Sequence, residues 1–493
     1  KPASHDTGPV DAASNRKPFR KLSVLMPVFN ERWTLPEIVD RVLNSPIDLD
    51  IELLIVDDAS TDGSFDVARE MAEGDPRIRV IRHEQNRGKG AAIRTAIDHM
   101  TGDIAIVQDA DLEYDPADFP KLLAPILDGR ADAVFGSRFV GHPRRVLFFW
   151  HALVNRFLTL VSNMLNDLNL TDMETCYKAV RADVLKSLRL QSNTFTFEPE
   201  LTCRLAQFGA RIYEVPVSYA GRTYQEGKKI KAIDGLKALW AMFYYRFVDT
   251  RFTHHTGFRI LRSVAKAGGY NRWILSQVQE YLGDRLLEAG SGIGNLSTAF
   301  LNKSRVVLAD YEPMYVEFLK RRFGRRRNVR VDRVDLTNPH DFERWSREQL
   351  DTVFCSNVLE HLEPDVDVLR SFHQTLVDGG HCVIVVPAGK KLFTVLDRAL
   401  GHHRRYTEAE LRRKMEAAGF DVVFARRFNK LGAIAWAVSG HLLRRDQLSP
   451  RQMIWFDRLL PIVKLLDRIL PVPGMSLIMV GRKRKAAAVR KAA

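Results

Sequence analysis

The chain has 493 residues, of which 45% are apolar and 27% are charged. This composition is typical of a globular protein and excludes a fibrous chain, a collagen-like repeat and wholesale disorder. At roughly 100–200 residues per domain, the length predicts about two to four domains. The net charge of +14 favours anionic partners such as phospholipid headgroups, nucleotides or nucleic acid.

The two ends of the chain are polar or basic. Residues 1–20 lack an apolar core, so we expect a disordered tail and no signal peptide. Residues 483–493 predict a solvated basic tail or, alternatively, a weak tether to an anionic membrane. The four cysteines form no CxxC pair, which favours a reducing, cytosolic setting. No apolar run reaches the roughly 18 residues that a membrane span needs.

Short apolar runs alternate with helical patterns from residue 21 to residue 250, which predicts a domain built on a mostly parallel sheet. We expect strands at Ser23–Val28, Leu53–Val56, Ile104–Val107, Ala133–Phe135 and Ile212–Val215. We expect helices at Leu35–Leu43, Phe65–Met71 and Ala91–His99. The apolar segments Val146–Leu165 and Leu239–Phe252 predict either buried core helices or helices lying in a membrane surface.

A second α/β pattern occupies residues 271–482, after a linker expected at 251–270. It opens with a helical pattern at Asn271–Leu282. Strand-like runs follow at Arg285–Glu288, Val306–Ala309, Val329–Val331, Thr352–Cys355 and His381–Val386. The chain is therefore expected to hold two doubly wound α/β domains.

Acidic residues follow the strands of the first domain, and open parallel sheets bind ligands at the carboxyl ends of their strands. Asp57 and Asp58 end one strand, while Asp109 and Asp111 follow another with Glu113 close by. Carboxylates in a D-x-D pattern can present oxygens to Mg²⁺ or Mn²⁺. Such a metal would neutralise a diphosphate leaving group.

Four blocks of the first domain carry a family resemblance: Ser23–Glu31, Val56–Gly63, Asn86–Ala92 and Asp109–Glu113. Their order and spacing resemble the family 2 glycosyltransferases, which implies a GT-A nucleotide-sugar-binding fold over 21–250. Within that family the chain is most similar to the dolichyl-phosphate mannose synthase group, which transfers a sugar to a polyprenyl phosphate. The segments that carry this are Gly136–Arg138, Arg156, Thr171–Lys178, Phe197–Glu200 and Arg222–Lys229.

The resemblance implies a metal-dependent, inverting sugar transfer. Residues implied to line the nucleotide-sugar are Pro27, Asn30, Glu31, Asp57, Asp58 and Lys89. The implied metal ligands are Asp109, Asp111 and Glu113, and the implied acceptor-phosphate residues are Arg138, Arg156, Arg222 and Lys229. A phosphate acceptor is already a nucleophile and needs cations more than a base. Asp172 would act as a catalytic base only for a hydroxyl acceptor and would otherwise hydrogen-bond within its loop.

The second domain contains the glycine-rich run Leu286–Gly294 after a strand and before an expected helix. With Asp310, Asp335-Leu336 and Asp351–His361 it resembles the class I S-adenosylmethionine-dependent methyltransferases, which implies a Rossmann-like fold. The residues implied to bind the cofactor are Glu288, Gly290, Gly292, Gly294, Asp310, Asp335, Leu336 and Asn357.

The sequence says little about the methyl acceptor. The only indication is a set of histidines near the side of the domain where the acceptor is expected to bind. A base for an oxygen nucleophile could come from His361, His402 or His403. His402 and His403, with the two arginines that follow them, could instead form a phosphate or metal site. Amphipathic helical patterns at Leu431–Leu443 and Trp455–Leu470 would cap the acceptor pocket or face a membrane.

We therefore predict a bifunctional enzyme at the inner face of the membrane, bound peripherally. It would use a nucleotide-sugar, a polyprenyl phosphate or other lipid acceptor, S-adenosylmethionine and Mg²⁺ or Mn²⁺, with methylation in the same glycolipid pathway. The alternatives are a glycosyltransferase with a hydroxyl acceptor, or a chain in which one domain is a non-catalytic binding module. Nucleic-acid binding is not expected, because no recognition motif accompanies the charge.

Overall fold

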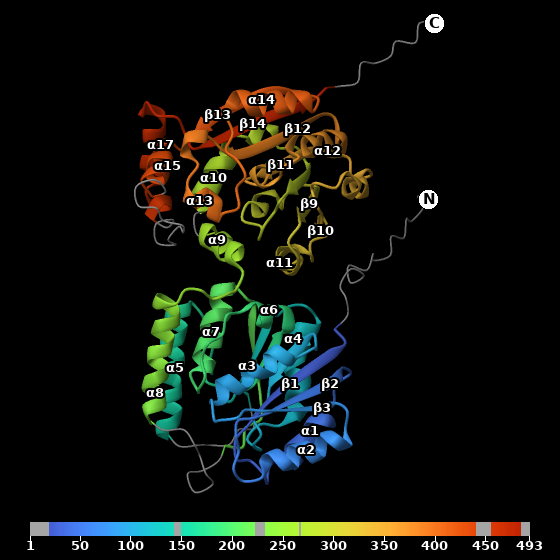
Figure 1. The fold of residues 1–493 in the computed structure, drawn as a ribbon, viewed down its shortest axis with the longest axis vertical. Coiled ribbons are helices and arrows are strands. Elements are labelled where there is room, and N and C mark those ends of the chain that lie inside the picture. The colour runs from blue at the N-terminus through green and yellow to red at the C-terminus, as the bar shows by residue number, and fades with distance from the viewer. Residues whose placement is uncertain (1–18, 142–148, 222–231, 266–267, 440–454, 485–493) are drawn as a thin grey trace, which may run out of the picture. The chain divides into compact units, whose positions relative to one another are not determined.

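The computed structural model of the chain describes residues 19–141, 149–221, 232–265, 268–439 and 455–484. These residues divide into two compact units, with the division between Thr256 and Gly257. Each unit is a sheet with helices packed against it (Figure 1). The expected pair of α/β domains is confirmed.

The described part of the first unit holds a seven-stranded sheet in the order β3-β2-β1-β4-β6-β5-β7. Strands β1 to β4 pair in parallel, whereas β6 runs antiparallel to both β4 and β5. The sheet is therefore mixed. The strands are β1 (Lys21–Val28), β2 (Asp50–Asp57), β3 (Ile78–Arg82), β4 (Ile104–Val107), β5 (Ala133–Ser137), β6 (Lys178–Arg181) and β7 (Ile212–Pro216).

Amphipathic helices cover this sheet. In α1 the buried residues Leu35, Ile38, Val39 and Val42 follow the helical repeat, which turns one apolar stripe toward the core. Most described helices of the unit follow that logic, but α5 and α8 pack against each other and keep apolar side chains exposed. The helices are α1 (Leu35–Leu43), α2 (Ser64–Gly74), α3 (Lys89–His99), α4 (Phe119–Leu127), α5 (Phe149–Asn166), α6 (Ala182–Ser187), α7 (Phe197–Phe208) and α8 (Ala232–Phe243).

The second unit also has a seven-stranded sheet among its described residues, in the order β10-β9-β8-β11-β12-β14-β13. All pairs from β10 to β12 are parallel, and β14 is antiparallel to β12 and β13. Buried apolar clusters line the sheet. The strands are β8 (Arg285–Ala289), β9 (Arg305–Asp310), β10 (Val329–Arg333), β11 (Leu350–Ser356), β12 (Leu376–Pro387), β13 (Phe420–Phe428) and β14 (Ser476–Lys483).

The helices of the second unit are shorter than several of the sequence patterns predict. The pattern from Asn271 is interrupted after α10 by a 3₁₀ turn at Gln279–Tyr281. Residues 256–264, expected as linker, form α9, and Lys483, expected in the tail, ends β14. The helices are α9 (Thr256–Val264), α10 (Gly268–Ser276), α11 (Pro313–Phe323), α12 (Asp365–Thr375), α13 (Val395–Ala399), α14 (Glu408–Ala417), α15 (Lys430–Ala437) and α17 (Leu460–Ile469).

The prediction of a helix directly after the glycine-rich run is wrong. The structure has only a 3₁₀ turn at Ser297–Phe300, and β9 begins at Arg305. Gly294 still has the left-handed φ of 78°, so the chain leaves the loop too late to build a full helix before that strand. The expected tails (1–18 and 485–493) and parts of the apolar patterns (146–148, 440–443) lie outside the described residues.

Candidate functional sites in the two units

The loops that follow β1 and β2 are hydrogen-bonded to each other at one edge of the first sheet. Val28 pairs with Asp57 in the parallel ladder, so both strands end at the same level. Asn30 then adopts a φ of 55°. Its N–H donates to Ser60 Oγ (3.0 Å), and its Oδ1 accepts from the Thr61 N–H (2.9 Å). These bonds hold the two polar loops side by side.

Asp58 is a buried residue that shapes the next loop. The residue is 3% exposed, and its carboxylate lies 2.7 Å from His83 Nδ1. It also accepts from the N–H groups of Arg87 (2.8 Å) and Gly88 (2.7 Å). Asp58 therefore holds the chain just before α3, where Lys89 begins the helix.

Lys89 lies between two carboxylates. Its Nζ is 2.8 Å from Asp109 Oδ1 and 3.2 Å from Glu198 Oε1. Burial alone would lower the pKa of Lys89, but these carboxylates outweigh it and raise that pKa well above its ordinary value. Glu198, on α7, had no role in the sequence analysis, although it lies in the Phe197–Glu200 segment. The structure thus places a permanent cation at the D-x-D loop.

The D-x-D loop carries three carboxylates after β4. Asp111 is 8% exposed, and its Oδ1 accepts from the Glu113 N–H (3.1 Å). Tyr219 donates to Glu113 Oε2 (2.9 Å), while Thr34 donates to the Ala110 carbonyl (2.9 Å). Asp109, Asp111 and Glu113 therefore offer the oxygen donors that Mg²⁺ and Mn²⁺ prefer. The chemistry of this donor set suits such an ion, although the three carboxylates do not bring one oxygen each within 4.8 Å of one another in this structure.

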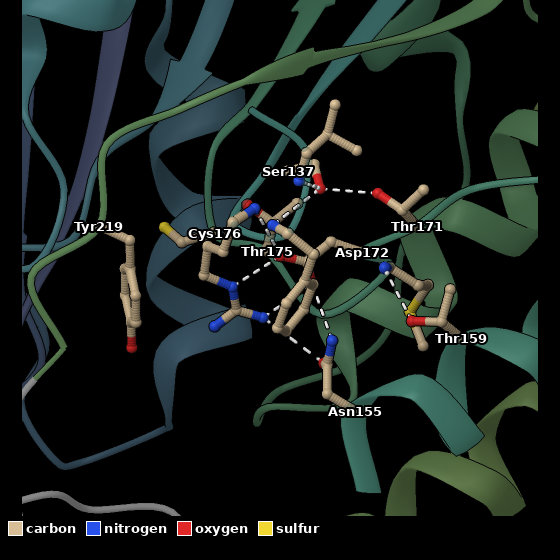
Figure 2. A network of polar contacts seen from close by, with 12 residues as sticks. Ser137, Asn155, Thr159, Thr171, Asp172, Thr175, Cys176 and Tyr219 are labelled. Carbon is tan, nitrogen blue, oxygen red and sulfur yellow. Dashed lines mark hydrogen bonds and ion pairs between the residues drawn. The ribbon is translucent and has the colours of Figure 1, made fainter. Parts of the chain in front are cut away.

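Asp172 lies within a polar network (Figure 2), and Arg138 is its main partner. Arg138 follows β5, and it donates to both carboxylate oxygens through Nε (2.6 Å) and Nη2 (2.8 Å). The backbone N–H of Arg138 (3.1 Å) and Asn155 Nδ2 on α5 (3.1 Å) also donate to Asp172. Burial raises the pKa of Asp172, but Arg138 outweighs this effect and the pKa is lowered.

Arg156, on α5, lines a hollow of about 390 Å³. The wall combines this cation with hydroxyl, amide and apolar groups, which suits an amphipathic ligand. Arg222 and Lys229, the other two expected acceptor cations, lie outside the described residues. The lining residues are Phe139, Val140, Arg156, Thr159, Leu160, Asn163, Leu170 and Thr171.

Helices α5 and α8 pack side by side (Figure 1). Their exposed apolar side chains form a surface that we call the α5–α8 face. Leu158, Ala238 and Met242 are buried between them with Met173. No helix in the described part of the chain is long and apolar enough to cross a membrane. The exposed members of the face are Phe149, Trp150, Leu153, Val154, Phe157, Leu160, Met164, Ile233, Leu236, Trp240 and Phe243.

In the second unit, the loop after β8 requires its glycines. Gly290, Gly292 and Gly294 have φ values of 77°, 55° and 78°, which L side chains rarely adopt. A Cβ at Gly290 would lie 2.1 Å from Val358 Cγ2. The loop is thus packed against the segment that follows β11. Burial raises the pKa of Glu288, at the end of β8, to about 8.

The acidic residue at the end of β9 is hydrogen-bonded to the glycine-rich loop. Asp310 accepts from the N–H groups of Gly292 (2.7 Å) and Glu312 (3.0 Å). Asp335 accepts from Thr337, and Asn357 is exposed with a φ of 53°. The left-handed glycines, which allow close approach of a ligand, and the carboxylate beside them fit a nucleoside cofactor such as S-adenosylmethionine.

The histidines of the second unit do not all converge. His361 and His402 lie together, with ring centroids 4.8 Å apart, whereas His403 is exposed. Arg404 pairs with Asp365 (2.9 Å), and Arg405 pairs with Asp397 (2.7 Å). His402 and Arg405 share Asp397, whereas Arg404 pairs with Asp365 and His403 is exposed, so the four residues do not form one site. Burial lowers the pKa of His361, and its neighbour His402 lowers it further.

Two protein families match the chain, one in each unit. Residues 23–189 match the family described as Glycosyl transferase family 2. Residues 287–382 match a family described as Methyltransferase domain. The two units are thus a glycosyltransferase domain and a methyltransferase domain in one polypeptide.

Relatives of the first unit are polyprenyl-phosphate mannosyltransferases. An undecaprenyl-phosphate mannosyltransferase from Micrococcus luteus is 32% identical over 225 residues, which cover 44% of this chain and 90% of that protein. A polyprenol monophosphomannose synthase from Mycolicibacterium smegmatis is 30% identical over 229 residues. The match covers 45% of this chain and 85% of that protein. The chain belongs to the family 2 glycosyltransferases. A methyltransferase domain follows in the same chain.

Solved structures of lower similarity include glucosyl-3-phosphoglycerate synthase from Mycobacterium tuberculosis. Its complex with Mn²⁺, uridine diphosphate and glucosyl-3-phosphoglycerate is 22% identical, with a TM-score of 0.36. The match covers 46% of this chain and 80% of that one.

Proposed function

We propose that the first unit transfers a sugar from a nucleotide-sugar to a polyprenyl phosphate. The named relatives support this acceptor class, and mannose is the first sugar to test. The observation that carries the proposal is on α5, where the cation Arg156 lies in a hollow and the same helix exposes large apolar side chains. A lipid phosphate needs both features, a cation for its headgroup and an apolar surface for its chain.

The polar groups of the first unit have distinct roles in this proposal. Lys89 holds Asp109 in place and adds positive charge near the diphosphate of the donor. Arg138 attracts the acceptor phosphate, whose oxygen is a nucleophile without a general base. A divalent ion held by Asp109, Asp111 and Glu113 would supply charge neutralisation at the leaving group.

Asp172 is a positioning residue for Arg138. A general base needs a lone pair directed at the substrate, whereas four N–H groups from Arg138 and Asn155 already donate to Asp172. This arrangement favours a phosphate acceptor over a hydroxyl acceptor, since the latter requires a base.

The second unit uses S-adenosylmethionine as methyl donor in this proposal. The left-handed glycines let the loop approach the cofactor closely, and Asp310 retains acceptor capacity for ribose hydroxyls. Leu336 and Asn357 would flank the adenine and the reacting side. The methyl acceptor belongs to the same glycolipid pathway, because fusion places one site's product near the other.

The experiment is product analysis with the purified full chain. Nucleotide-activated mannose and polyprenyl phosphate are incubated with Mg²⁺ or Mn²⁺, and lipid extracts are examined by mass spectrometry. We expect a lipid-linked sugar that is absent when polyprenyl phosphate is replaced by the free polyprenol. Transfer to the polyprenol alone would support the hydroxyl-acceptor alternative. No transfer with any of a panel of nucleotide-sugars would contradict the proposal.

A further inference from the structure

Three titratable side chains of the second unit converge after β11 and α13. Glu360 and His361 follow β11, and His402 follows α13. One ligand atom of each lies within 4.8 Å of those of the other two. The rings of His361 and His402 are steeply inclined, at 76° to each other. We call these three residues the Glu–His–His cluster.

Glu360 is the unusual member of the cluster. It is 0% exposed, and neither carboxylate oxygen has a hydrogen-bond partner in the described part of the chain. The imidazole of His402 is near, but its Nε2 is 3.9 Å from Glu360 Oε1, which is too long for a hydrogen bond. A buried carboxylate without partners is costly, so its oxygens call for a further ligand.

The nearest guanidinium does not meet that need. Arg405 is 2% exposed, and its Nε donates to Asp397 at 2.7 Å. The same Asp397 accepts from the backbone of Thr394 and from Trp436 Nε1. Arg405 is thus paired with Asp397, and although its charge acts on Glu360, no described side chain donates a hydrogen bond to the Glu360 carboxylate.

Both imidazoles are oriented by groups on their Nδ1 side. His402 Nδ1 lies 3.0 Å from Asp397 Oδ1, and His361 Nδ1 lies 3.1 Å from the Gly401 carbonyl. A carbonyl only accepts, so His361 carries its hydrogen on Nδ1 and leaves the Nε2 lone pair available. The carboxylate favours the same tautomer in His402. This is how metal-binding histidines are typically held by a second layer of groups.

We propose that Glu360, His361 and His402 bind a divalent transition-metal ion, with Zn²⁺ as the best fit. Two imidazoles and one carboxylate suit Zn²⁺, whereas Mg²⁺ and Ca²⁺ prefer oxygen ligands alone. Bonds of about 2.0–2.2 Å would bring the ligand atoms to about 3.4 Å from one another. In this structure the three ligand atoms lie within 4.8 Å of one another, so metal binding requires them to move closer together.

The position of the ion suggests its use. Three protein ligands leave a fourth position for water or a substrate oxygen. Val358, two residues before Glu360, packs against Gly290 in the loop to which we assign the cofactor. Resting on the proposed methyl transfer, this geometry assigns the methyl acceptor an oxygen group that binds the ion, such as a hydroxyl of a sugar or lipid headgroup.

The test is metal binding by the full chain, measured apart from activity. Chelator-treated protein is titrated with Zn²⁺ by calorimetry, and with Co²⁺ while the visible absorption of tetrahedral Co²⁺ is recorded. All proteins carry Asp111→Asn, so that the first unit's carboxylates do not contribute. We expect one tight site that is lost in Glu360→Gln and in His402→Ala. The matched control His403→Ala, which changes the exposed neighbour, should retain it.

Two outcomes would overturn the metal site: no tight Zn²⁺ binding by the parent, or binding unchanged in Glu360→Gln and His402→Ala. Glu360→Gln keeps the shape of the side chain, and circular dichroism checks that each variant is folded. S-adenosylmethionine binding is measured on the same samples. Zn²⁺ binding without S-adenosylmethionine binding would contradict the proposed methyl transfer and leave the metal site supported.

Discussion

At the scale of single residues, the contacts of Asp172 distinguish positioning from catalysis. Replacing Asp172 with Asn keeps its size but removes the charge that orients Arg138. Charge-assisted hydrogen bonds contribute about 1.5–3 kcal/mol, so we expect the KM for polyprenyl phosphate to rise roughly ten- to hundredfold. The pH profile of kcat should keep its shape.

Steady-state kinetics over a range of pH test this prediction. Asp183→Asn, which changes an exposed acid paired with Arg181, serves as control. A collapse of kcat with loss of the basic limb of the profile would instead identify Asp172 as a general base.

Glu288 links the stability of the methyltransferase unit to pH. Its pKa is about 8 in the folded protein, against 4.5 for an ordinary glutamate, because burial disfavours the charged form. The folded state therefore holds a proton that the unfolded chain has lost. This stabilisation is complete below about pH 4.5 and declines as the pH rises through about 8.

We expect the thermal unfolding temperature of this unit to fall between pH 5 and pH 9. Glu288→Gln should flatten the curve in part, because burial also raises the pKa of Glu360 to about 8. The control is Glu317→Gln, on the exposed side of α11. Identical slopes in Glu288→Gln and the parent protein would refute the assignment.

At the scale of elements, the α5–α8 face predicts attachment to a lipid surface. Trp240 is 64% exposed and Leu236 is 63% exposed. Other apolar residues of α5 and α8 already form the buried contact between the two helices, so these two side chains are not needed for it. Burying a large apolar side chain contributes about 1.5–3 kcal/mol, so each substitution to Gln should weaken vesicle binding roughly tenfold.

Co-sedimentation with vesicles of neutral and anionic lipid measures this effect. Leu127→Gln, an exposed apolar residue at the end of α4, is the matched control. Equal binding of the Leu236 and Trp240 variants and the parent would exclude the face as the attachment site. Binding to anionic vesicles alone, abolished by salt, would assign the role to basic residues.

At the scale of the whole molecule, we expect a substitution that inactivates one unit to leave the activity of the other unit intact. Asp310→Ala removes the carboxylate that binds the glycine-rich loop, so we expect S-adenosylmethionine binding to be lost while sugar transfer continues. Asp111→Asn should abolish sugar transfer, and a chelator should do the same to the parent protein. S-adenosylmethionine binding should survive in Asp111→Asn.

Labelled S-adenosylmethionine then reports whether the activities are connected. If the methyl acceptor is the product of the first unit or its lipid carrier, methyl incorporation into the lipid fraction falls in Asp111→Asn. Unchanged incorporation would show that the methyl acceptor does not depend on sugar transfer. Asp115→Asn, which retains its cap on the following turn, controls for changes in the D-x-D loop.

The sequence by itself determined the order of the two α/β domains, several strand and helix positions and the family of the first unit. Helix α1 and strand β4 agree with the expected residues, because their apolar repeat or buried run is unbroken. Strands β3 and β6 were not predicted, since they are short and carry arginine or lysine. Strands β13 and β14 were also missed, because their place in the sheet depends on antiparallel partners distant in the chain.

Only the tertiary structure decided which side chains meet. Lys89 and Glu198 are more than a hundred residues apart in the sequence, which no local motif can connect. They pair because the fold brings the first turns of α3 and α7 together. No role was predicted for Glu360, although it precedes His361 in the sequence. Its distinguishing property is a buried carboxylate without hydrogen-bond partners, and a sequence pattern does not reveal burial of this kind. Periodicity reports the local backbone and the buried face, whereas pairing of charges depends on contacts that only the folded chain creates.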